Sequence, residues 1–591
     1  MVGQTHSLAG LPGCRIGHKF FTEPPLSRPD TITAYSLEDN EFWLRHLLSV
    51  GSQFGAAIYI LHKMWSYSML NYLAIPVFIV GLIKFLERIW FQWKASMDQF
   101  RKSVLRGPDP GPNYSKFMDE YSSKKAEGFQ VGRVPLVEDV LEVEQAHTST
   151  IHSAYYFFQT FKPLFAGLIL SFQDLKISQS FFRTQENGEK AFGVLEIELG
   201  FMYDVLYTKA ILNPTRHYHW IRLFLAVWSP PVFILFLFSY RHELSKIDVI
   251  ITLLLLIGAI LLEIYGVILH LSSDWTILRS QKPKDCLIEV ISYFRRFHLI
   301  PADKRWSDSV SQYNLMSFCL RDKETMCKRI QKFFSIYEML EKLHIKRKSV
   351  TPELKILIFK LLEKKSEVAS SPIRCKELLA CRGEQVLKEM KCFALFGWCI
   401  NVEFDRSILL WHIATDICYY KDGIGRSTER EASKLLSDYM LYLLVFCPFM
   451  LPNGIGQIRF QDTCAEAIEF FKERKSVTGE KEACSKLLQV CTEVPPSEVK
   501  GDRSKSVLFD ACRLAKTLQT LSNEKKWEMM SHVWIEILSY AASQCGWQNH
   551  AKKLSEGGEL LTHVWLLMAH LGLSEQFQIS EGHGRVKLVV K

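Results

Sequence analysis

Residues 249–271 read VIITLLLLIGAILLEIYGVILHL, the clearest apolar run in the chain. A helix needs about 20 apolar residues to cross the hydrocarbon of a bilayer. This run is long enough and contains one carboxylate, Glu263. The next clearest run is Ile221–Tyr240, in which Pro230-Pro231 predicts a kink. Together the two runs predict a membrane hairpin.

A weaker apolar pair lies upstream. Leu70–Leu86 is short but apolar, and the run at 47–64 carries several polar residues. Its Gly51-x-x-x-Gly55 spacing either lets a neighbouring helix approach closely or arises by chance in a marginal span. Counting both pairs, we expect about four membrane-spanning helices.

Lysine and arginine placement predicts the sidedness of these spans. Basic residues gather after Leu86, before Ile221 and after Leu271, while the two short turns inside the pairs carry few. Because such residues favour the cytoplasmic side, the N-terminus, the 87–217 loop and the C-terminal region are predicted to be cytoplasmic. The protein is thus expected to be an integral, multi-pass membrane protein with the lipid bilayer as its first partner.

Composition and cysteine placement point the same way. The chain has 591 residues, a net charge of +9 and 15 cysteines, of which only Cys14 precedes Cys286. Scattered cysteines without a CxxC pair fit buried thiols in a reducing compartment better than disulfides or zinc sites. The modest positive charge and the lack of a clustered basic footprint argue against nucleic acid as a partner.

The remaining segments predict helices in water. Tyr155–Phe172 is interrupted by Lys162-Pro163, so we expect a buried or interfacial helix and not a fifth span. Beyond residue 273, apolar residues recur at three- and four-residue steps, which predicts a large soluble all-helical C-terminal region. The tail GRVKLVVK predicts one short strand. The fold class is therefore mainly α.

These patterns divide the chain into seven parts. They are a 1–43 N-terminal segment, a 44–90 transmembrane pair, a 91–217 cytoplasmic loop domain, a 218–272 transmembrane pair, a 273–475 cytoplasmic helical domain, a 476–504 linker and a 505–591 C-terminal helical domain.

Motifs that carry chemistry are scarce. The chain lacks a phosphate-binding GxxxxGK[ST] loop, an HExxH metal helix and a GxSxG nucleophile elbow. We therefore assign no catalytic residue, metal ligand or cofactor. Two features remain open: Glu263, an intramembrane carboxylate that serves transport or fixes packing, and the pair His412 and Asp416. These two lie four residues apart on one predicted helix face, as an acid–base couple or as a structural ion pair.

Several stretches resemble one known family. They are Pro29–Leu48, Ile197–Ala210, Leu409–Tyr420, Ser437–Pro452 and Gly557–Leu573, and the resemblance covers roughly residues 28–575. They are similar to the plant membrane proteins that join a domain of unknown function 4220 to a C-terminal domain of unknown function 594. The resemblance implies a plant multi-pass membrane protein and no reaction. Family members usually have further helices before PDTITAYSLEDNE, whereas residues 1–27 are polar here, which suggests a shortened form or an incomplete gene model.

Three functions fit these observations. The first is a membrane-anchored helical interaction or scaffold protein whose cytoplasmic region binds protein partners. The second is a transporter or channel component using Glu263, which at four spans calls for an oligomer. The third is a membrane-tethered enzyme using His412 and Asp416.

Overall fold

The computed structural model is mainly helical. It describes residues 33–63, 65, 69–104, 114–129, 131–135, 150–168, 170, 172–185, 188–209, 231, 233–238, 246–271, 274–279, 306, 308–322, 345–369, 371–423, 427–474, 477, 479–494, 506–575 and 586–590.

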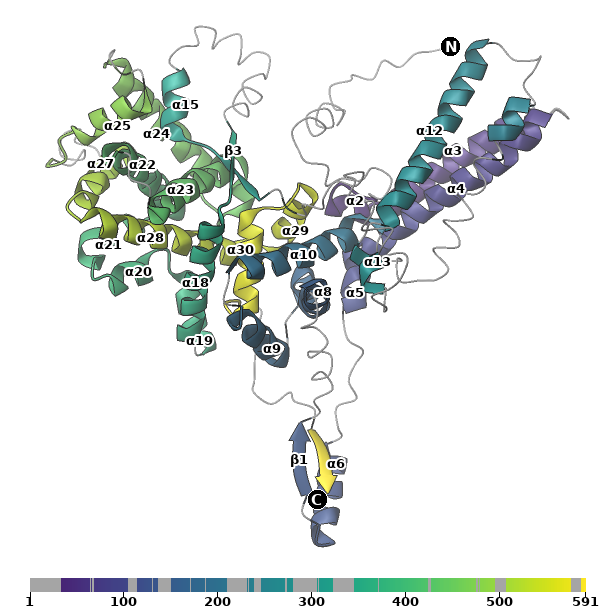
Figure 1. Ribbon diagram of the computed structural model, residues 1–591, viewed down its shortest axis with the longest axis horizontal. Coiled ribbons are helices and arrows are strands. Elements are labelled where there is room, and N and C mark those ends of the chain that lie inside the picture. Colours follow the sequence, from purple (N-terminus) through teal and green to yellow (C-terminus); the bar gives the residue numbers. More distant parts are fainter. Residues whose placement is uncertain are drawn as a thin grey trace.

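Three long helices project from one end of a helical body (Figure 1). They are α3 (Trp43–Lys63), α4 (Met69–Ala95) and α12 (Lys246–Leu271). Among the described residues one helix, α12, is long and apolar enough over Val249–Gly266 to cross a membrane, and little of that stretch is buried. The finding covers one of the four spans expected from the sequence.

The structure describes two of the other three expected spans and only part of the third. Helices α3 and α4 include the runs 47–64 and 70–86 and pack against each other, with the Phe54 ring 4.8 Å from that of Phe78. A Cβ atom at Gly51 or Gly55 would meet no atom within 4 Å, so no helix among the described residues packs closely against this small-residue face. Most of the run 221–240 lies outside the described residues. The multi-pass arrangement therefore stays a prediction.

Short helices connect the projecting helices to the body. They are α2 (Leu37–Glu41), α5 (Met97–Val104), α8 (Thr150–Phe161), the 3₁₀ helix η1 (Lys162–Ala166), α9 (Phe172–Arg183), α10 (Gly188–Tyr207) and α13 (Asp274–Arg279). Helix α8 gives way to η1 at the Lys162-Pro163 step, because proline cannot continue the α-helical hydrogen bonding. Phe157, Phe161 and Phe165 of this segment are buried, which confirms the prediction of a packed helix.

The C-terminal region supplies most of the body. Its helices are α15 (Leu315–Asp322), α18 (Pro352–Val368), α19 (Pro372–Ala380), α20 (Glu384–Glu389), α21 (Phe393–Ile400), α22 (Phe404–Lys421), α23 (Thr428–Phe446), η3 (Pro448–Met450), α24 (Gly456–Lys472), α25 (Glu480–Leu488), α27 (Val507–Leu518), α28 (Asn523–Gln544), α29 (Trp547–Ser555) and α30 (Leu560–His570). Helix α25 lies within the segment 476–504 that was predicted to be a linker. Its buried Ala483, Cys484 and Leu487 explain the difference, since they give this charged segment one apolar face.

Local sequence sets several of these helix starts. Thr351 and Ser371 each precede a proline, and their hydroxyl oxygens accept the backbone N–H groups of Leu354 and Arg374. Each cap satisfies an N–H group that the first turn of a helix leaves unpaired, while proline at the first position has no N–H to lose.

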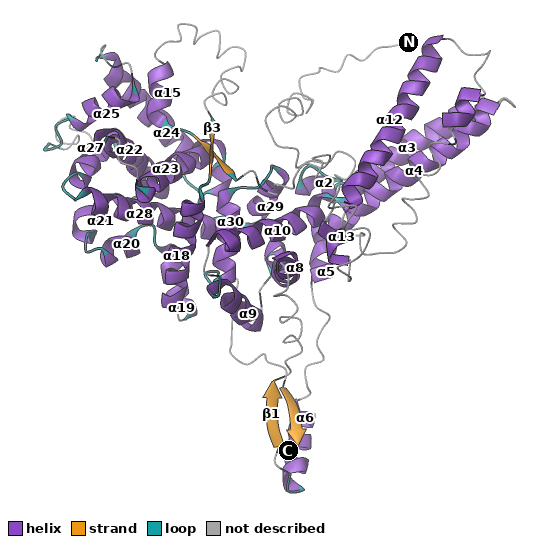
Figure 2. Ribbon diagram, in the orientation of Figure 1, coloured by secondary structure: helices purple, strands orange, loops and turns teal. Residues whose placement is uncertain are grey.

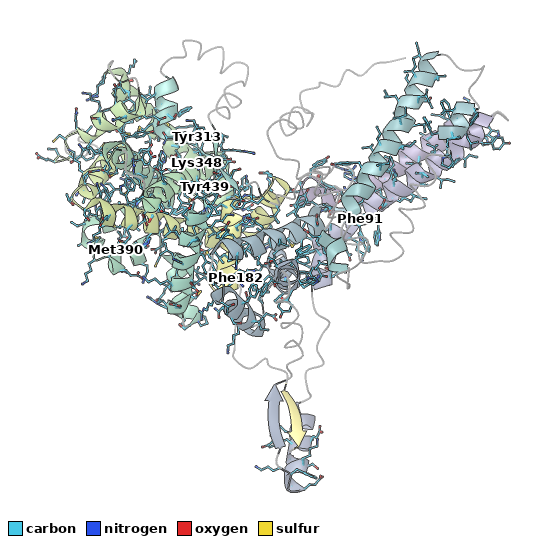
Figure 3. All side chains as sticks on the ribbon, viewed as in Figure 1. Phe91, Phe182, Tyr313, Lys348, Met390 and Tyr439 are labelled. Atoms are coloured by element: carbon cyan, nitrogen blue, oxygen red, sulfur yellow. The ribbon has the colours of Figure 1, made fainter. Side chains whose placement is uncertain are left out.

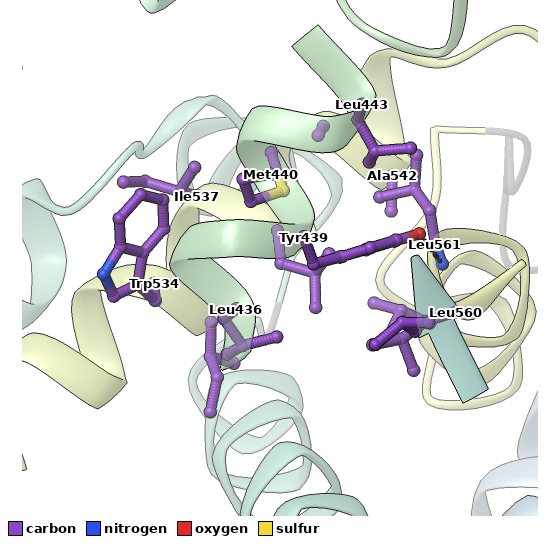
Figure 4. Close-up of a cluster of buried hydrophobic side chains, with 14 of the residues drawn as sticks. Leu436, Tyr439, Met440, Leu443, Trp534, Ile537, Ala542, Leu560 and Leu561 are labelled. Atoms are coloured by element: carbon purple, nitrogen blue, oxygen red, sulfur yellow. Dashed lines mark hydrogen bonds between the residues drawn. The ribbon is translucent and has the colours of Figure 1, made fainter. Parts of the chain in front are cut away.

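Helices α23, α28 and α30 meet in a close-packed interior (Figure 4). Tyr439 extends from α23 toward α30, where its hydroxyl oxygen accepts the backbone N–H of Leu561 at 3.1 Å. Trp534 of α28 is fully buried, and its indole N–H donates to the Thr415 hydroxyl of α22 at 3.1 Å. The Tyr439 hydroxyl and the Trp534 indole N–H thus each have a partner on another helix, as burial favours.

Two small antiparallel ribbons accompany the helices (Figure 2). One pairs β2 (Ser309–Gln312) with β3 (Lys346–Ser349). The other pairs β1 (Val131–Pro135) with β4 (Val586–Val590) beside helix α6 (Tyr114–Ala126), and it confirms the strand predicted in the tail. The prediction of an all-helical C-terminal region was wrong to this extent.

One hydrophobic core runs through the whole body. It includes Phe182 of α9, Tyr313 near α15 and Tyr439 of α23, which are labelled in Figure 3. Helix α10, from the predicted loop domain, packs against α8, α18 and α30. Segments that the sequence divides into separate domains therefore share one interior, and the proposed boundaries stay a prediction.

Candidate functional site

The predicted pair His412 and Asp416 lies in the middle of helix α22. All side chains from Phe404 to Cys418 are buried, because α23, α24, α25 and α27 surround this helix. Helix α23 contributes Lys434 and Asp438 to the same place, and Asn314 joins them from the residue before α15. The five side chains form a buried polar cluster, here called the His412 cluster.

Lys434 lies at the centre of the His412 cluster. Its Nζ atom is 2.5 Å from Oδ1 of Asp416 and 2.8 Å from Oδ1 of Asp438. The Asn314 amide donates to Oδ2 of Asp416 at 2.6 Å and to Oδ1 of Asp438 at 3.1 Å. One ammonium and one amide thus satisfy two carboxylates that solvent does not reach freely.

The ring of His412 is held in one neutral form. Its Nε2 atom accepts the backbone N–H of Leu315 at 3.3 Å, so Nδ1 carries the hydrogen and donates to the Ser437 hydroxyl at 2.9 Å. Burial lowers the pKa of His412, and the two nearby aspartates offset this only in part. Asp416 and Asp438 lie 3.8 Å from the ring nitrogens, beyond hydrogen-bond distance.

The charges divide unequally between the two aspartates. Burial alone would raise the pKa of Asp416, but Lys434 and His412 hold it below its usual value. The pKa of Asp438 is raised by burial and by the charge of Asp416. Lys434 keeps its proton, because both carboxylates raise its pKa against the effect of burial.

Ligand atoms of His412, Asp416 and Asp438 all lie within 4.8 Å of one another, a spacing that a metal ion could use. Lys434 already supplies the positive charge at these carboxylates, and the His412 lone pair is taken by the Leu315 N–H. His412 and Asp416 are both 0% exposed, so no substrate reaches them in this state. The chemistry that the His412 cluster supports is internal: an ion pair network that joins α22 to α23.

The other predicted site residue, Glu263, belongs to helix α12. Its side chain lies outside what the structure describes. Its role in transport or in packing stays a prediction.

A second buried cluster joins residues far apart in the chain. His570, at the end of α30, lies with Nε2 2.8 Å from Oε2 of Glu198 in α10 and Nδ1 2.7 Å from the Ser178 hydroxyl in α9. The rings of Phe161 and Phe182 cover it at centroid distances of 3.9 and 4.5 Å. All three polar residues are buried, so this hydrogen-bonded Ser-His-Glu triad holds α9, α30 and α10 together. A substrate cannot reach it in this state.

Sequence reasoning missed most members of both clusters. Lys434 and Asp438 are spaced four apart on a predicted helix, which is a usable signal for an ion pair. Glu198 and His570 both lie in stretches that carry the family resemblance, yet nothing local indicates that they meet. Contacts separated by 372 residues are decided by packing.

Acid is expected to destabilise the protein through histidines that fold in the neutral form. Burial lowers the pKa of His550 to about 3 and that of His563 to about 4. Below pH 6.5 the unfolded chain binds protons at these rings and the folded chain does not, so their share of stability is complete above pH 6.5 and lost as the pH falls. Each should cost about 2 kcal/mol at pH 5.

Unfolding free energies measured at pH 7, 6 and 5 check this. His550 stacks on Trp565, and its ring nitrogens make two long hydrogen bonds, to Thr562 at 3.2 Å and to the Ala542 carbonyl oxygen at 3.4 Å. The substitution His550→Gln removes the titrating ring and keeps a polar side chain. The variant should lose about 2 kcal/mol less than the parent between pH 7 and 5. An unchanged pH dependence would show that His550 does not fold neutral.

Comparisons with known proteins give the family. A model of a domain of unknown function (DUF4220) matches residues 25–319, and a model of a protein of unknown function (DUF594) matches residues 519–573. No curated protein and no solved structure matches the chain. The matched regions meet at His570, which DUF594 contributes, and at Glu198 and Ser178, which DUF4220 contributes. The chain belongs to the family of proteins that join a DUF4220 domain to a C-terminal DUF594 domain.

Proposed function

We propose that the protein is a multi-pass membrane protein whose helical body lies on the cytoplasmic side and serves as a binding scaffold for other proteins. The observation that carries the membrane part of this proposal is the apolar surface of the three projecting helices. Leu254, Ile250 and Leu48 are 70%, 64% and 68% exposed. Soluble proteins rarely expose apolar patches on this scale, and lipid is the solvent that suits them.

A polar boundary closes this apolar surface on the side of the body. Helix α4 is mostly apolar up to Leu86, with Lys84 near the end of this stretch, and Glu87 then pairs with Lys209 at 3.3 Å. The next turn is also polar, since the Arg88 and Gln92 side chains both donate to the Thr33 carbonyl oxygen. This change supports a membrane surface near residue 87, where the partly exposed Trp90 suits the interface.

The direction of the helices supports an even number of spans. Helix α3 leaves the body and α4 returns to it, while α12 runs back toward the body, where Trp275 just after it donates to Asp204 at 2.9 Å. If α12 spans the membrane toward the body, the chain has to cross outward before residue 246. We propose that the predicted span 221–240 makes this crossing, which would give four spans with both termini on the side of the body.

The cytoplasmic side is supported by charge and by thiols. Basic residues dominate the segments that join the body. The described cysteines are free thiols, and nearly all are buried, as expected in a reducing compartment.

Glycosylation mapping tests the topology. Asn-x-Thr acceptors inserted at 66–68 or at 241–245 should be glycosylated, because these turns are predicted to face the lumen. Acceptors inserted at 107–112 or at 497–503 should stay unmodified. Modification at either of the latter positions, or release of the whole protein by alkaline carbonate, would contradict the proposal.

The scaffold role has a separate test. When the protein is extracted from its native membrane in a mild detergent and run on size exclusion, its mass after correction for detergent should be well above the 68.5 kDa of one chain. A mass of one chain would argue against a stable complex with partners and would not bear on the topology.

A further inference from the structure

A cavity of about 290 Å3 lies between helices α18, α19, α20 and α28, away from both buried clusters. Its wall is largely apolar, with Leu361, Leu378, Val386, Met390 and Ile535 among the lining residues. Eight polar residues also line it: Lys364, Lys365, Gln385, Glu389, Glu528, His532, Glu536 and Ser539. A cavity that combines an apolar wall with convergent polar groups is the usual form of a small-molecule site.

Lys365 is poorly satisfied by the protein. An amine with up to three N–H donors makes one long hydrogen bond, 3.4 Å from Nζ to the Ser539 hydroxyl oxygen. Within the described residues no carboxylate oxygen lies within 4.0 Å of this Nζ atom. The adjacent Lys364 differs, because it is exposed and pairs with Glu389 at 2.7 Å.

Glu536 faces the same cavity without pairing to Lys365. Its two carboxyl oxygens accept the backbone N–H groups of Gln385 and Val386, at 3.3 and 3.1 Å. Burial raises the pKa of Glu536 despite these bonds. Burial also lowers the pKa of Lys365, which the charge of Glu536 offsets only in part. Both groups are thereby pushed toward their neutral forms, an amine and a carboxylic acid.

We propose that this cavity binds a small, mostly apolar aldehyde or ketone, and that the Lys365 amine condenses with its carbonyl carbon to form an imine. The geometry carries the proposal: an unpaired amine and a separate acid line one apolar cavity. The inference concerns the body alone and does not rest on the proposed membrane topology.

The step balances without a further reagent. The nitrogen lone pair of Lys365 forms the C–N bond while the carbonyl π pair moves to oxygen. That oxygen takes one proton from the nitrogen and a second from Glu536, the C–O bond breaks, and water leaves. Glu536 regains its proton from the iminium nitrogen, so the net change is amine plus carbonyl to imine plus water.

The ligand class follows from size and charge. The volume lies near the lower end of the range for small-molecule sites, and the apolar part of the wall favours a short hydrocarbon chain. A multiply charged anion such as a phosphate ester is disfavoured, because acidic lining residues outnumber the lysines. They are Glu389, Glu528 and Glu536, against Lys364 and Lys365. A neutral carbonyl oxygen needs one donor, and the His532 ring, which makes no hydrogen bond to the described residues, can provide it.

Reductive trapping on the full-length protein tests the proposal. The protein is incubated at pH 7 with butanal and cyanoborohydride, which reduces an imine to a stable amine, and labelling is quantified for each lysine by peptide mass spectrometry. Lys365 should be labelled at least about tenfold faster than Lys360, an exposed lysine on the same helix, because burial favours the neutral, nucleophilic amine and the cavity holds the aldehyde beside it. Labelling of Lys365 at or below the rate of Lys360 would overturn the proposal.

Two further comparisons separate a binding site from a merely reactive amine. The ratio of the labelling rate with butanal to that with the hydrophilic aldehyde glyceraldehyde should be larger at Lys365 than at Lys360. Equal ratios at the two lysines would overturn the assignment of an apolar ligand. Glu536→Gln should slow labelling of Lys365 at least about tenfold and leave Lys360 unchanged. If that variant fails to fold, the comparison between the two lysines in the parent protein still decides the outcome.

Discussion

Replacing Lys434 with methionine is expected to lower the free energy of unfolding by about 3–5 kcal/mol. The substitution keeps much of the side-chain length but removes the ammonium that lies 2.5 and 2.8 Å from Asp416 and Asp438. Two carboxylates then remain in the interior with only Asn314 to share between them. An unpaired buried charge costs far more than a lost surface ion pair, so this effect should be among the largest available to a single substitution.

Denaturant unfolding of the purified protein in detergent measures this change. Lys364→Met is the matched control, because Lys364 also pairs with a glutamate but its side chain is 63% exposed. That control should change stability by less than about 1 kcal/mol. Equal effects of the two substitutions would show that the His412 cluster is not the ion pair network described above. Adding Asp438→Asn to Lys434→Met should restore part of the loss, since the double variant contains one buried carboxylate fewer.

Replacing His570 with alanine is expected to cost a similar amount, about 3–5 kcal/mol. The change removes the partner of Glu198 at 2.8 Å and leaves a cavity among Phe157, Phe161 and Phe182. Because His570 belongs to DUF594 and Glu198 to DUF4220, the substitution should also loosen the contact between the two matched regions. Limited proteolysis should then cut the chain between them faster than in the parent protein.

His152→Ala is the control for this experiment. His152 is exposed on α8 in the same body, so its loss should change stability by no more than about 0.5 kcal/mol. The double variant His570→Ala with Glu198→Leu should be less destabilised than His570→Ala alone, because it leaves no buried carboxylate without a partner. If the loss of stability in the double variant equals the sum of the losses in the two single variants, the effect of His570→Ala comes from lost ring packing instead.

The interlocked core has a consequence for how the family is understood. DUF594, at residues 519–573, does not pack by itself: α30 lies against α10 and α9, and Tyr207 of α10 donates to the Ala551 carbonyl oxygen at 2.8 Å. Trp306 stacks on His563 at 4.1 Å, and Gly558 approaches the same tryptophan in a backbone conformation with φ of +85°. The two matched regions are therefore parts of one folded body, from which the projecting helices emerge.

The sequence by itself determined those features that depend on neighbouring residues. The apolar run 249–271 predicted a helix that could span a membrane, and the described part of α12 agrees with it. Apolar residues at three- and four-residue steps predicted helices beyond residue 273, and α23 at Thr428–Phe446 is one of them. The break at Lys162-Pro163 likewise marked the end of α8. Helical period, span length and proline breaks are all properties of a short window of chain, which is why they can be read from it.

Only the tertiary structure decided what the candidate residues contact. The spacing of His412 and Asp416 left an acid–base couple and a structural ion pair open. Lys434 and Asn314, which no local pattern places beside them, are the groups that bond Asp416 in the folded protein. The meeting of His570 with Glu198 and the cavity around Lys365 depend in the same way on distant helices packing together. Burial and the identity of the partner set the charge and reactivity of an ionisable side chain, and both are properties of the assembled core.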